Sequence, residues 1–319
     1  MQPRLEVRNA EIERARHTAA PRKRRRDATV SHFLMTFTCL VFVACSAPAA
    51  PPAASARVPA QGSALTITYV ANEGFLITAG GRAVLVDALF RALPGGSAAR
   101  PGDALIAQMT QGAPPFARID ALLVSHDHQD HFDPALVQAF LARHPETTLL
   151  STGAICATVA AAGGPAARMR RIRIDLGASA VESVAGMSVK AARVRHGGEP
   201  SFPLNFLPAS CAGTTTENLA WLVTIDGRKF LHVGDAWTEG KVKTYRKLGL
   251  PAERIDVLFL SYFDFSGATA AFVKNELKPR YIIAMHVPTR GGERDLATFR
   301  KTYPNAIVFT KPLEARTLN

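Results

Sequence analysis

Runs of apolar residues along the chain predict short strands that are separated by turns and helices. Strands are expected at 65–70, 75–78, 83–87, 148–150, 187–195, 219–225, 229–233, 257–260, 281–285 and 306–309. Helical spacing of apolar residues is found at 103–111, 134–143, 154–162, 268–277 and 294–303. The clearest hairpin joins 219–225 to 229–233 through Asp226-Gly227, a dipeptide that is typical of tight turns. These elements begin at about residue 64, so the folded domain is expected to occupy residues 64–319.

A further apolar run, residues 121–124, leads directly into Ser125-His126-Asp127-His128-Gln129-Asp130-His131. In extended backbone, alternate side chains point the same way, so His126, His128 and Asp130 can converge, and His131 can join them after a turn. Three of the nine histidines of the chain lie within six positions, which ordinary surface histidines rarely do. Imidazoles and a carboxylate grouped in this way predict a site for zinc or a similar divalent metal. Four such ligands in one loop exceed the need of one catalytic metal, which favours a pair of metals.

The H-x-H-x-D-H pattern, placed after a short strand and before a helix, resembles the signature of the metallo-β-lactamase-fold hydrolases. The resemblance extends over about residues 64–312. It implies an α/β protein with an αββα sandwich of four layers. Two mostly antiparallel sheets would lie face to face, with helices on the outer faces and a metal site at one edge.

The resemblance also implies a ligand set for two metals. His126, His128 and His196 would hold the first metal, and Asp130, His131 and His286 the second. Asp235 would bridge them together with a shared hydroxide, so Asp130 and Asp235 are the expected catalytic carboxylates. Zinc is the expected metal, with manganese and iron as alternatives.

The implied activity is metal-dependent hydrolysis of an ester, lactone or phosphodiester bond in a small-molecule or lipid substrate. The branches that look most similar are the ascorbate-phosphate-lactonase-like proteins and the phospholipase D of N-acyl-phosphatidylethanolamine. The alternative is an exported lipoprotein that binds a metal or ligand without turnover.

Three further predictions concern the surroundings of this site. Tyr262 and Asp264 follow a strand and are candidates for a substrate-side role, although Asp264 is equally suited to cap the next helix. His232 is expected to be a core histidine or to support a metal ligand from behind. The aromatic loop at 199–216 is expected to form a lid or a pocket wall beside His196.

The first 63 residues have the composition of an export signal and not of a folded domain. Residues 1–60 contain ten Lys/Arg and four Asp/Glu, so about half of the net charge of +12 lies there, and the basic charge argues little for a nucleic-acid partner. A basic block at 22–26 precedes an apolar run at 33–44 and then Cys45, an order that predicts a signal peptide at 1–45. The sequence around Cys45 resembles a lipobox, and residues 46–63 form an Ala/Pro-rich tether. We therefore expect that the protein is exported to the bacterial cell envelope, where a lipid on Cys45 anchors it to a membrane with its folded domain facing the periplasm. The alternative is that the signal peptide is cleaved at 47–56 and no lipid is added.

Overall fold

The computed structural model describes residues 64–91, 99–197, 216–236 and 242–319. The predicted signal peptide with Cys45, the tether at 46–63 and nearly all of the aromatic loop at 199–216 lie outside these residues. Within the described ranges, no helix combines the length and the apolar character needed to cross a membrane.

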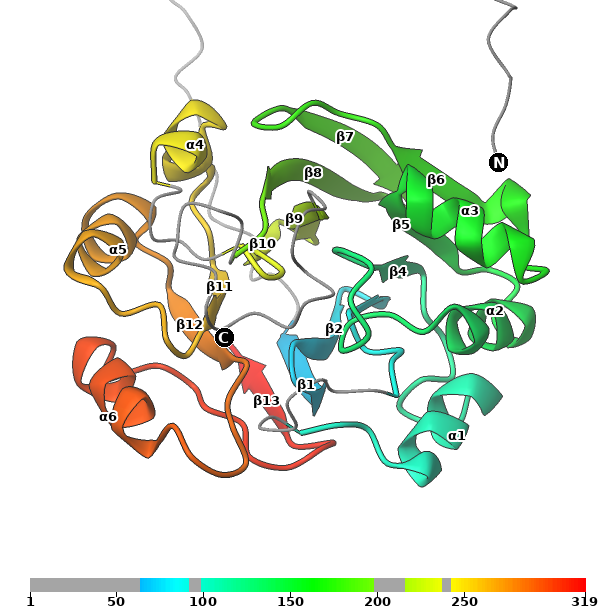
Figure 1. Ribbon diagram of the computed structural model, residues 1–319, viewed down its shortest axis with the longest axis horizontal. Helices are drawn as coiled ribbons and strands as arrows, with labels where there is room; N and C mark the ends of the chain where they lie inside the picture. Colours follow the sequence, from blue (N-terminus) through cyan, green and yellow to red (C-terminus); the bar gives the residue numbers. More distant parts are fainter. Residues whose placement is uncertain (1–63, 92–98, 198–215, 237–241) are drawn as a thin grey trace, which may run out of the picture. The chain divides into compact units, whose positions relative to one another are not determined.

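Two β-sheets form the centre of the described domain (Figure 1). The first has the order β13-β1-β2-β3-β4-β5-β6 and the second the order β12-β11-β10-β9-β8-β7. The strands of the first sheet are β1 (Leu65–Ala71), β2 (Gly74–Ala79), β3 (Arg82–Val86), β4 (Ala121–Leu123), β5 (Thr148–Thr152), β6 (Met169–Ile172) and β13 (Ala315–Leu318). Those of the second are β7 (Ser179–Val184), β8 (Met187–Arg195), β9 (Glu217–Ile225), β10 (Arg228–His232), β11 (Val257–Ser261) and β12 (Tyr281–Met285).

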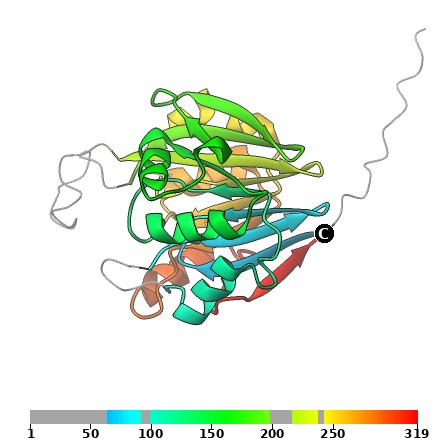
Figure 2. The same cartoon turned by 90° about the vertical axis from the view of Figure 1, so that its right-hand side faces the viewer.

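Helices cover the outer face of each sheet. Figure 2 shows the helices of the first half lying over the strands of the first sheet, and Figure 1 shows the later helices beyond the second sheet. The first group comprises α1 (Asp103–Gln111), α2 (Pro134–Arg143), α3 (Gly153–Ala161) and the short η1 (Ala166–Arg168). The second comprises α4 (Val242–Lys247), η3 (Leu250–Glu253), α5 (Gly267–Phe272), its π-helical continuation η4 (Val273–Leu277) and α6 (Glu293–Thr302). The four-layer αββα sandwich is thus confirmed.

Alternation along the strands explains why the layers stack. In β3, Val84 and Val86 belong to the core shared with the second sheet, whereas Leu85 belongs to the core under α1–α3. Successive side chains of a strand point to opposite faces, so a strand that is apolar on both faces needs a layer on each side. Two apolar cores therefore border the first sheet.

The strand pairing is more evenly mixed than the predicted, mostly antiparallel sheets. Of the strand pairs in the described ranges, six are antiparallel and five are parallel. The reason is that a helix lies between each pair of consecutive strands from β3 to β6 and from β10 to β12, and such crossovers return the chain parallel to the previous strand.

The predicted last strand at 306–309 is wrong. In this segment only Ile307 pairs, through an isolated bridge to Ile283. The last strand is instead β13, which pairs with β1 and forms the edge of the first sheet. Ala315, Arg316 and Thr317 are exposed, so β13 carries no apolar pattern that a sequence analysis could detect.

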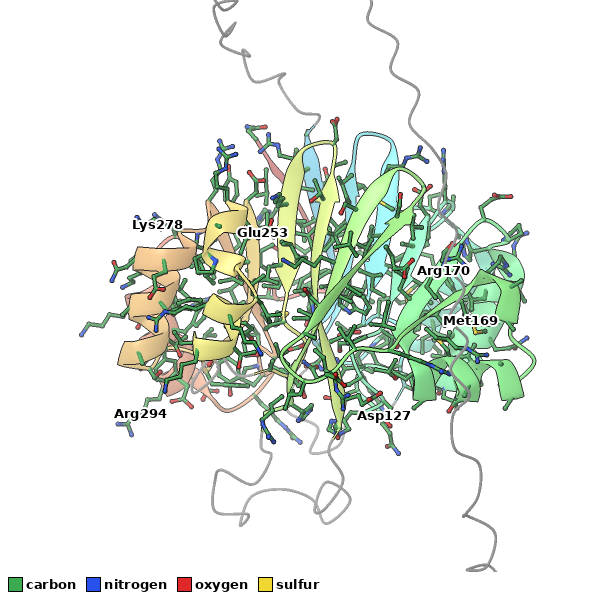
Figure 3. The ribbon with its side chains drawn as sticks, turned by 90° about the horizontal axis from the view of Figure 1, so that it is seen from above. Asp127, Met169, Arg170, Glu253, Lys278 and Arg294 are labelled. Carbon is green, nitrogen blue, oxygen red and sulfur yellow. The ribbon has the colours of Figure 1, made fainter. Side chains whose placement is uncertain are left out.

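The two sheets bring several strand ends to one edge of the sandwich. Strands β3 and β4 run parallel, as do β10, β11 and β12, so their carboxyl ends meet on the same side. Asp127, in the loop after β4, lies at this end of the strands, whereas Arg170 and Lys278 lie on opposite flanks (Figure 3). The polar residues that follow these strands therefore converge.

Candidate metal centre

The first group of possible metal ligands joins the two sheets. It consists of His126, His128, His196 and Asp235, each of which offers one ligand atom within 4.8 Å of the others. His126 and His128 follow β4, His196 follows β8, and Asp235 follows β10. The imidazole ring centroids of His126 and His196 are 4.7 Å apart, and those of His128 and His196 are 4.5 Å apart. The sequence predicted all four as ligands, and the structure places them together.

The second group contains one residue that the sequence analysis did not single out. Its members are Glu73, His131, Asp235 and His286, again with ligand atoms within 4.8 Å. Glu73 lies in the turn between β1 and β2, and His286 follows β12. Nε2 of His286 is 3.2 Å from Oε1 of Glu73. This group too takes its members from both sheets.

Asp235 belongs to both groups, and its two carboxylate oxygens face different ways. Oδ2 is 3.1 Å from Nε2 of His196 and 3.6 Å from Nε2 of His126. Oδ1 is 2.6 Å from Nε2 of His286 and 3.3 Å from Nε2 of His131. Each oxygen thus serves one group, which is the arrangement that a bridging carboxylate requires.

Asp87, at the end of β3, holds two of the histidines in a defined orientation. The carboxylate of Asp87 accepts two hydrogen bonds from Ser125, one from the backbone N–H at 2.8 Å and one from the side-chain hydroxyl at 2.5 Å. It also accepts one from Nδ1 of His131 at 3.1 Å. Because the Ser125 hydroxyl donates to Asp87, its oxygen accepts from Nδ1 of His126 at 2.9 Å. In both histidines Nδ1 is thus occupied by a hydrogen bond, and Nε2 faces the centre as the atom available to a metal.

Close packing fixes the backbone that carries Asp235. Asn218 donates to the backbone oxygen of Val233 at 3.1 Å and accepts from the N–H of Asp235 at 3.2 Å. Gly234 has a φ of +56°, and a Cβ there would lie 2.5 Å from Oδ1 of Asn218 and 2.8 Å from Cβ of Ser125. Only glycine fits at this position.

Charges within the centre shift the pKa values of its members strongly. Burial would raise the pKa of Asp235, but His286, His131 and His126 hold it well below its usual range. Burial would likewise lower the pKa of His286, but Asp235 and Glu73 raise it to about 9. Burial lowers the pKa of His126 well below its usual value. In the metal-free protein His286 is therefore protonated beside the Asp235 carboxylate, and it must lose this proton to bind a metal.

The donor atoms fit divalent metals. Nε2 of His126, Nε2 of His131 and Oε2 of Glu73 are buried and have no hydrogen-bond partner among the described residues. Buried polar atoms of this kind are uncommon in folded proteins and need an explanation. A metal at each group would take up these atoms, because imidazole nitrogens and carboxylate oxygens are its usual ligands.

Asp130 lies at the border of the second group. Its Oδ2 is 3.7 Å from Nε2 of His131 and accepts a hydrogen bond from Nδ2 of Asn72 at 3.3 Å. Its carboxylate is not among the atoms that lie within 4.8 Å of one another. The structure thus places this predicted ligand beside the second group and Glu73 within it.

His232 is buried and supports the centre from behind. Its Nε2 donates to the backbone oxygen of Glu73 at 2.9 Å, and its Nδ1 accepts from the N–H of Gly234 at 3.2 Å. Its ring also offers a nitrogen within 4.8 Å of carboxylate oxygens of Glu73 and Asp87, but both ring nitrogens are occupied by backbone groups, as is typical of a histidine that supports a ligand.

Of the predicted substrate-side residues, Tyr262 lies close to α6, and the backbone of Asp264 contacts Tyr303, which follows α6. Asp264 is buried and its backbone oxygen accepts from the hydroxyl of Tyr303 at 3.1 Å. The alternative that Asp264 caps α5 is wrong, because Ser266 is the N-cap and accepts from the N–H of Thr269. Tyr262 is half-buried, and its pKa is raised by burial and by Asp295 and Glu293. Neither residue belongs to the groups of possible ligands described above.

A pocket of about 620 Å³ lies at the ends of β6, β8 and β9. Its lining includes Arg173, Arg193 and Glu217, of which the last two form an ion pair at 3.0 Å. Glu217 directly follows Thr216, whose hydroxyl is 3.4 Å from Nε2 of His128. The pocket is of a size that holds a small molecule.

The comparisons with known proteins agree with this site. Residues 66–286 match the β-lactamase superfamily domain. Because this match covers most of the described domain, the chain belongs to the β-lactamase superfamily.

A relative and two solved structures extend the comparison. A UPF0173 metal-dependent hydrolase of Cupriavidus taiwanensis is 24% identical over 265 residues, which is 80% of this chain and 86% of that protein. A metallo hydrolase from the archaeon Ignicoccus hospitalis is similar in fold with a TM-score of 0.54 at 14% identity, over 81% of this chain and 99% of that one. A metallo-β-lactamase fold protein from Bacillus subtilis gives a TM-score of 0.51 at 13% identity, over 79% and 99%. The chain therefore has the metallo-β-lactamase fold, and the relative from Cupriavidus taiwanensis is named a metal-dependent hydrolase.

Proposed function

We propose that the protein is a binuclear hydrolase that cleaves an ester, lactone or phosphodiester bond in a small-molecule or lipid substrate. The observation that carries this proposal is the position of Asp235, which offers one oxygen to each of two groups of ligands. A single-metal enzyme would need only one of these groups. Zinc suits the three histidines of the first group, and zinc, manganese or iron suits the second.

Two divalent ions, when bound, supply an activated shared water molecule and polarise the bond that it attacks. The residues of the chain prepare this chemistry. Asp87 and Ser125 orient the imidazoles of His126 and His131. Asp235 fixes the spacing of the two groups. Asp130, whose side chain is 17% exposed, lies beside the second group and can accept a proton at Oδ2.

The proposal of a small substrate is supported by the pocket whose lining includes Glu217, the residue after Thr216. Its volume of about 620 Å³ falls within the range of ligand sites, and its lining includes Arg173 in addition to the ion-paired Arg193 and Glu217. Turnover of a panel of lactones, carboxylic esters and phosphodiesters, measured with and without a chelator, will identify the bond. Turnover of the preferred class should stop when the chelator is added and return when the metal is restored.

The bridging role is tested by Asp235→Asn, which removes the charge and retains the shape. We expect metal content to fall below about two equivalents per chain and turnover to fall more than about 100-fold. The reason is that even the loss of a residue that only hydrogen-bonds to a metal ligand lowers metal affinity about 10–100-fold. Asp127→Asn is the matched control, since Asp127 is exposed in the same loop and belongs to neither group. Full metal content and normal turnover in Asp235→Asn would contradict the bridging role.

A further inference from the structure

We infer that Glu73 is a ligand of the second metal, and that its carboxylate makes this position prefer a harder ion, such as Mn²⁺, than the first position does. The inference rests on the proposed two-metal function. It concerns a residue that lies outside the H-x-H-x-D-H loop and at none of the strand ends from which the other ligands come.

The burial of Glu73 is the first observation. The residue has no exposed surface, although it lies in a turn between two strands. Its Oε1 is 3.2 Å from Nε2 of His286 and 3.4 Å from the hydroxyl of Ser261. Its Oε2 has no hydrogen-bond partner among the described residues and lies 3.9 Å from Nδ1 of His131. Burying a carboxylate in this way is costly unless a charge or a metal compensates it.

The turn that carries Glu73 is held in place from several sides. The backbone oxygen of Glu73 accepts from His232, on the strand that leads to Asp235. The preceding residue, Asn72, has a φ of +48°, which non-glycine residues seldom adopt. A Cβ on Gly74 would lie 2.9 Å from both the oxygen of Ala71 and the Cα of Ala88. Strained backbone of this kind persists where the surroundings enforce it, and it is commonest at functional sites.

The two groups differ in donor chemistry because of Glu73. The first group offers three imidazoles and one carboxylate, whereas the second offers two imidazoles and two carboxylates. Asp130 lies next to the second group and adds further oxygen atoms there. Carboxylate oxygens suit manganese, whereas imidazole nitrogens suit zinc and iron. The second position has Glu73 where the first has a third imidazole, so its preference should shift toward manganese.

A purely structural role for Glu73 makes the opposite predictions. If Glu73 only accepts hydrogen bonds from Ser261 and His286, its removal should destabilise the metal-free protein and leave metal affinity unchanged. If it is a ligand, its removal takes out of the metal-free core a buried carboxyl group whose Oε2 has no hydrogen-bond partner among the described residues. The stability of the metal-free protein is then retained or raised, and metal affinity is lost.

The experiment compares the wild type with Glu73→Gln. Chelator-treated full-length protein is titrated separately with ZnCl₂ and MnCl₂, the free Mn²⁺ is followed by its electron paramagnetic resonance signal, and the melting temperature without metal is recorded. We expect Mn²⁺ affinity at the second equivalent to fall about 10-fold or more, with a smaller loss for Zn²⁺ and no drop in the metal-free melting temperature. Equal losses for both ions would overturn the preference, and unchanged affinities would overturn the ligand role.

Two further proteins complete the design. Asp120→Asn is the matched control, because Asp120 is also a buried carboxylate but binds Arg82 and the N–H of Ala83 at the opposite end of β4. It should lower the melting temperature and leave both metal affinities unchanged. If Glu73→Gln does not fold, Glu73→Asp keeps the charge but withdraws it by one methylene, and it should also lose Mn²⁺ affinity. Binding of fewer than two equivalents by the wild type would refute the two-metal function itself, and not only the role of Glu73.

Discussion

Ser125 connects Asp87 to a metal ligand without belonging to either group of ligands. Ser125→Ala leaves Nδ1 of His126 without its hydrogen-bond partner, so the imidazole is no longer fixed in one tautomer. We expect metal affinity to fall about 10–100-fold, measured by competition with a chelating dye. Ser151→Ala is the control, because this buried hydroxyl donates to the backbone oxygen of Val124, the residue that follows β4. It should cost about 1 kcal/mol of stability and leave metal affinity unchanged.

Two glycines with positive φ allow the cost of backbone strain to be measured apart from the cost of steric crowding. Gly227 has a φ of +76°, and a Cβ added to it would meet no atom of the described residues within 4 Å, whereas one added to Gly234 would meet Asn218 and Ser125. Gly227→Ala should cost about 1–2 kcal/mol, which is the cost of a left-handed conformation. Gly234→Ala should cost more and also lower metal content, because it displaces Asp235. Equal losses of unfolding free energy in urea for the two variants would show that crowding contributes nothing.

At this scale the sequence reveals ligands only where they are close together or at a recognisable position. His126, His128 and His131 are visible because they share one loop, and His286 because it ends an apolar strand. Glu73 gives no such signal, since an acidic residue in a hairpin turn is ordinarily exposed. Its burial depends on the docking of the second sheet, which brings His232 and Ser261 against it.

Among the elements, strands with an apolar pattern were predicted well, whereas the edge strands β7 and β13 were not predicted. β8 is observed at Met187–Arg195, the range expected from its alternation. α2 begins after Asp133, which caps it by accepting from Ala135 and Leu136. β13 was missed because its stability comes from backbone pairing with β1, and three of its four residues face solvent. Pairing between distant segments is a tertiary property that a local pattern does not encode.

The loop between β11 and α5 provides a prediction at the element scale. Asp264 is buried near Tyr303, whose pKa is raised by burial and by the Asp264 charge. We therefore expect Asp264→Asn to change the melting temperature while turnover stays within about two-fold, since a general acid would contribute about 10²–10⁴-fold. Measuring both quantities on one preparation decides the matter. A drop in turnover of about 100-fold with an unchanged melting temperature would make Asp264 catalytic.

For the whole molecule, the charges of the centre predict how pH affects the metal-free protein. The pKa of His286 is about 9 when folded and about 6.5 when unfolded, so the folded state binds more protons between these values. Stability must then fall as pH rises through this window. Glu73, with its pKa raised by burial to about 8, acts in the same direction.

The measurement is the melting temperature in excess chelator at pH values from about 6 to about 9, the window that the two pKa values of His286 define. A decline is expected in the wild type, and a shallower one in His286→Gln, which removes the titrating group. Identical slopes in the two proteins would contradict this assignment. With metal present the trend should reverse, because deprotonated His286 binds the ion more tightly.

We also propose that the whole chain is exported and anchored through a lipid on Cys45. The basic block, apolar run and cysteine in residues 22–45 support this proposal. Cys45→Ala should move the protein from the membrane fraction to the soluble fraction, because stable anchoring depends on the added acyl chains. Mass spectrometry that finds residue 1 intact and unmodified in the mature protein would refute export.

Each group of ligands takes two members from the first sheet and two from the second, and this has a kinetic consequence. His126 and His128 face His196 and Asp235, while Glu73 and His131 face Asp235 and His286. A bound ion would therefore cross-link the two sheets, and they could not separate until the ion dissociates. Because the ion stabilises contacts that a loosened transition state lacks, it should slow unfolding more than it accelerates folding. The ions proposed for the chemistry would thus also give the folded domain a long lifetime.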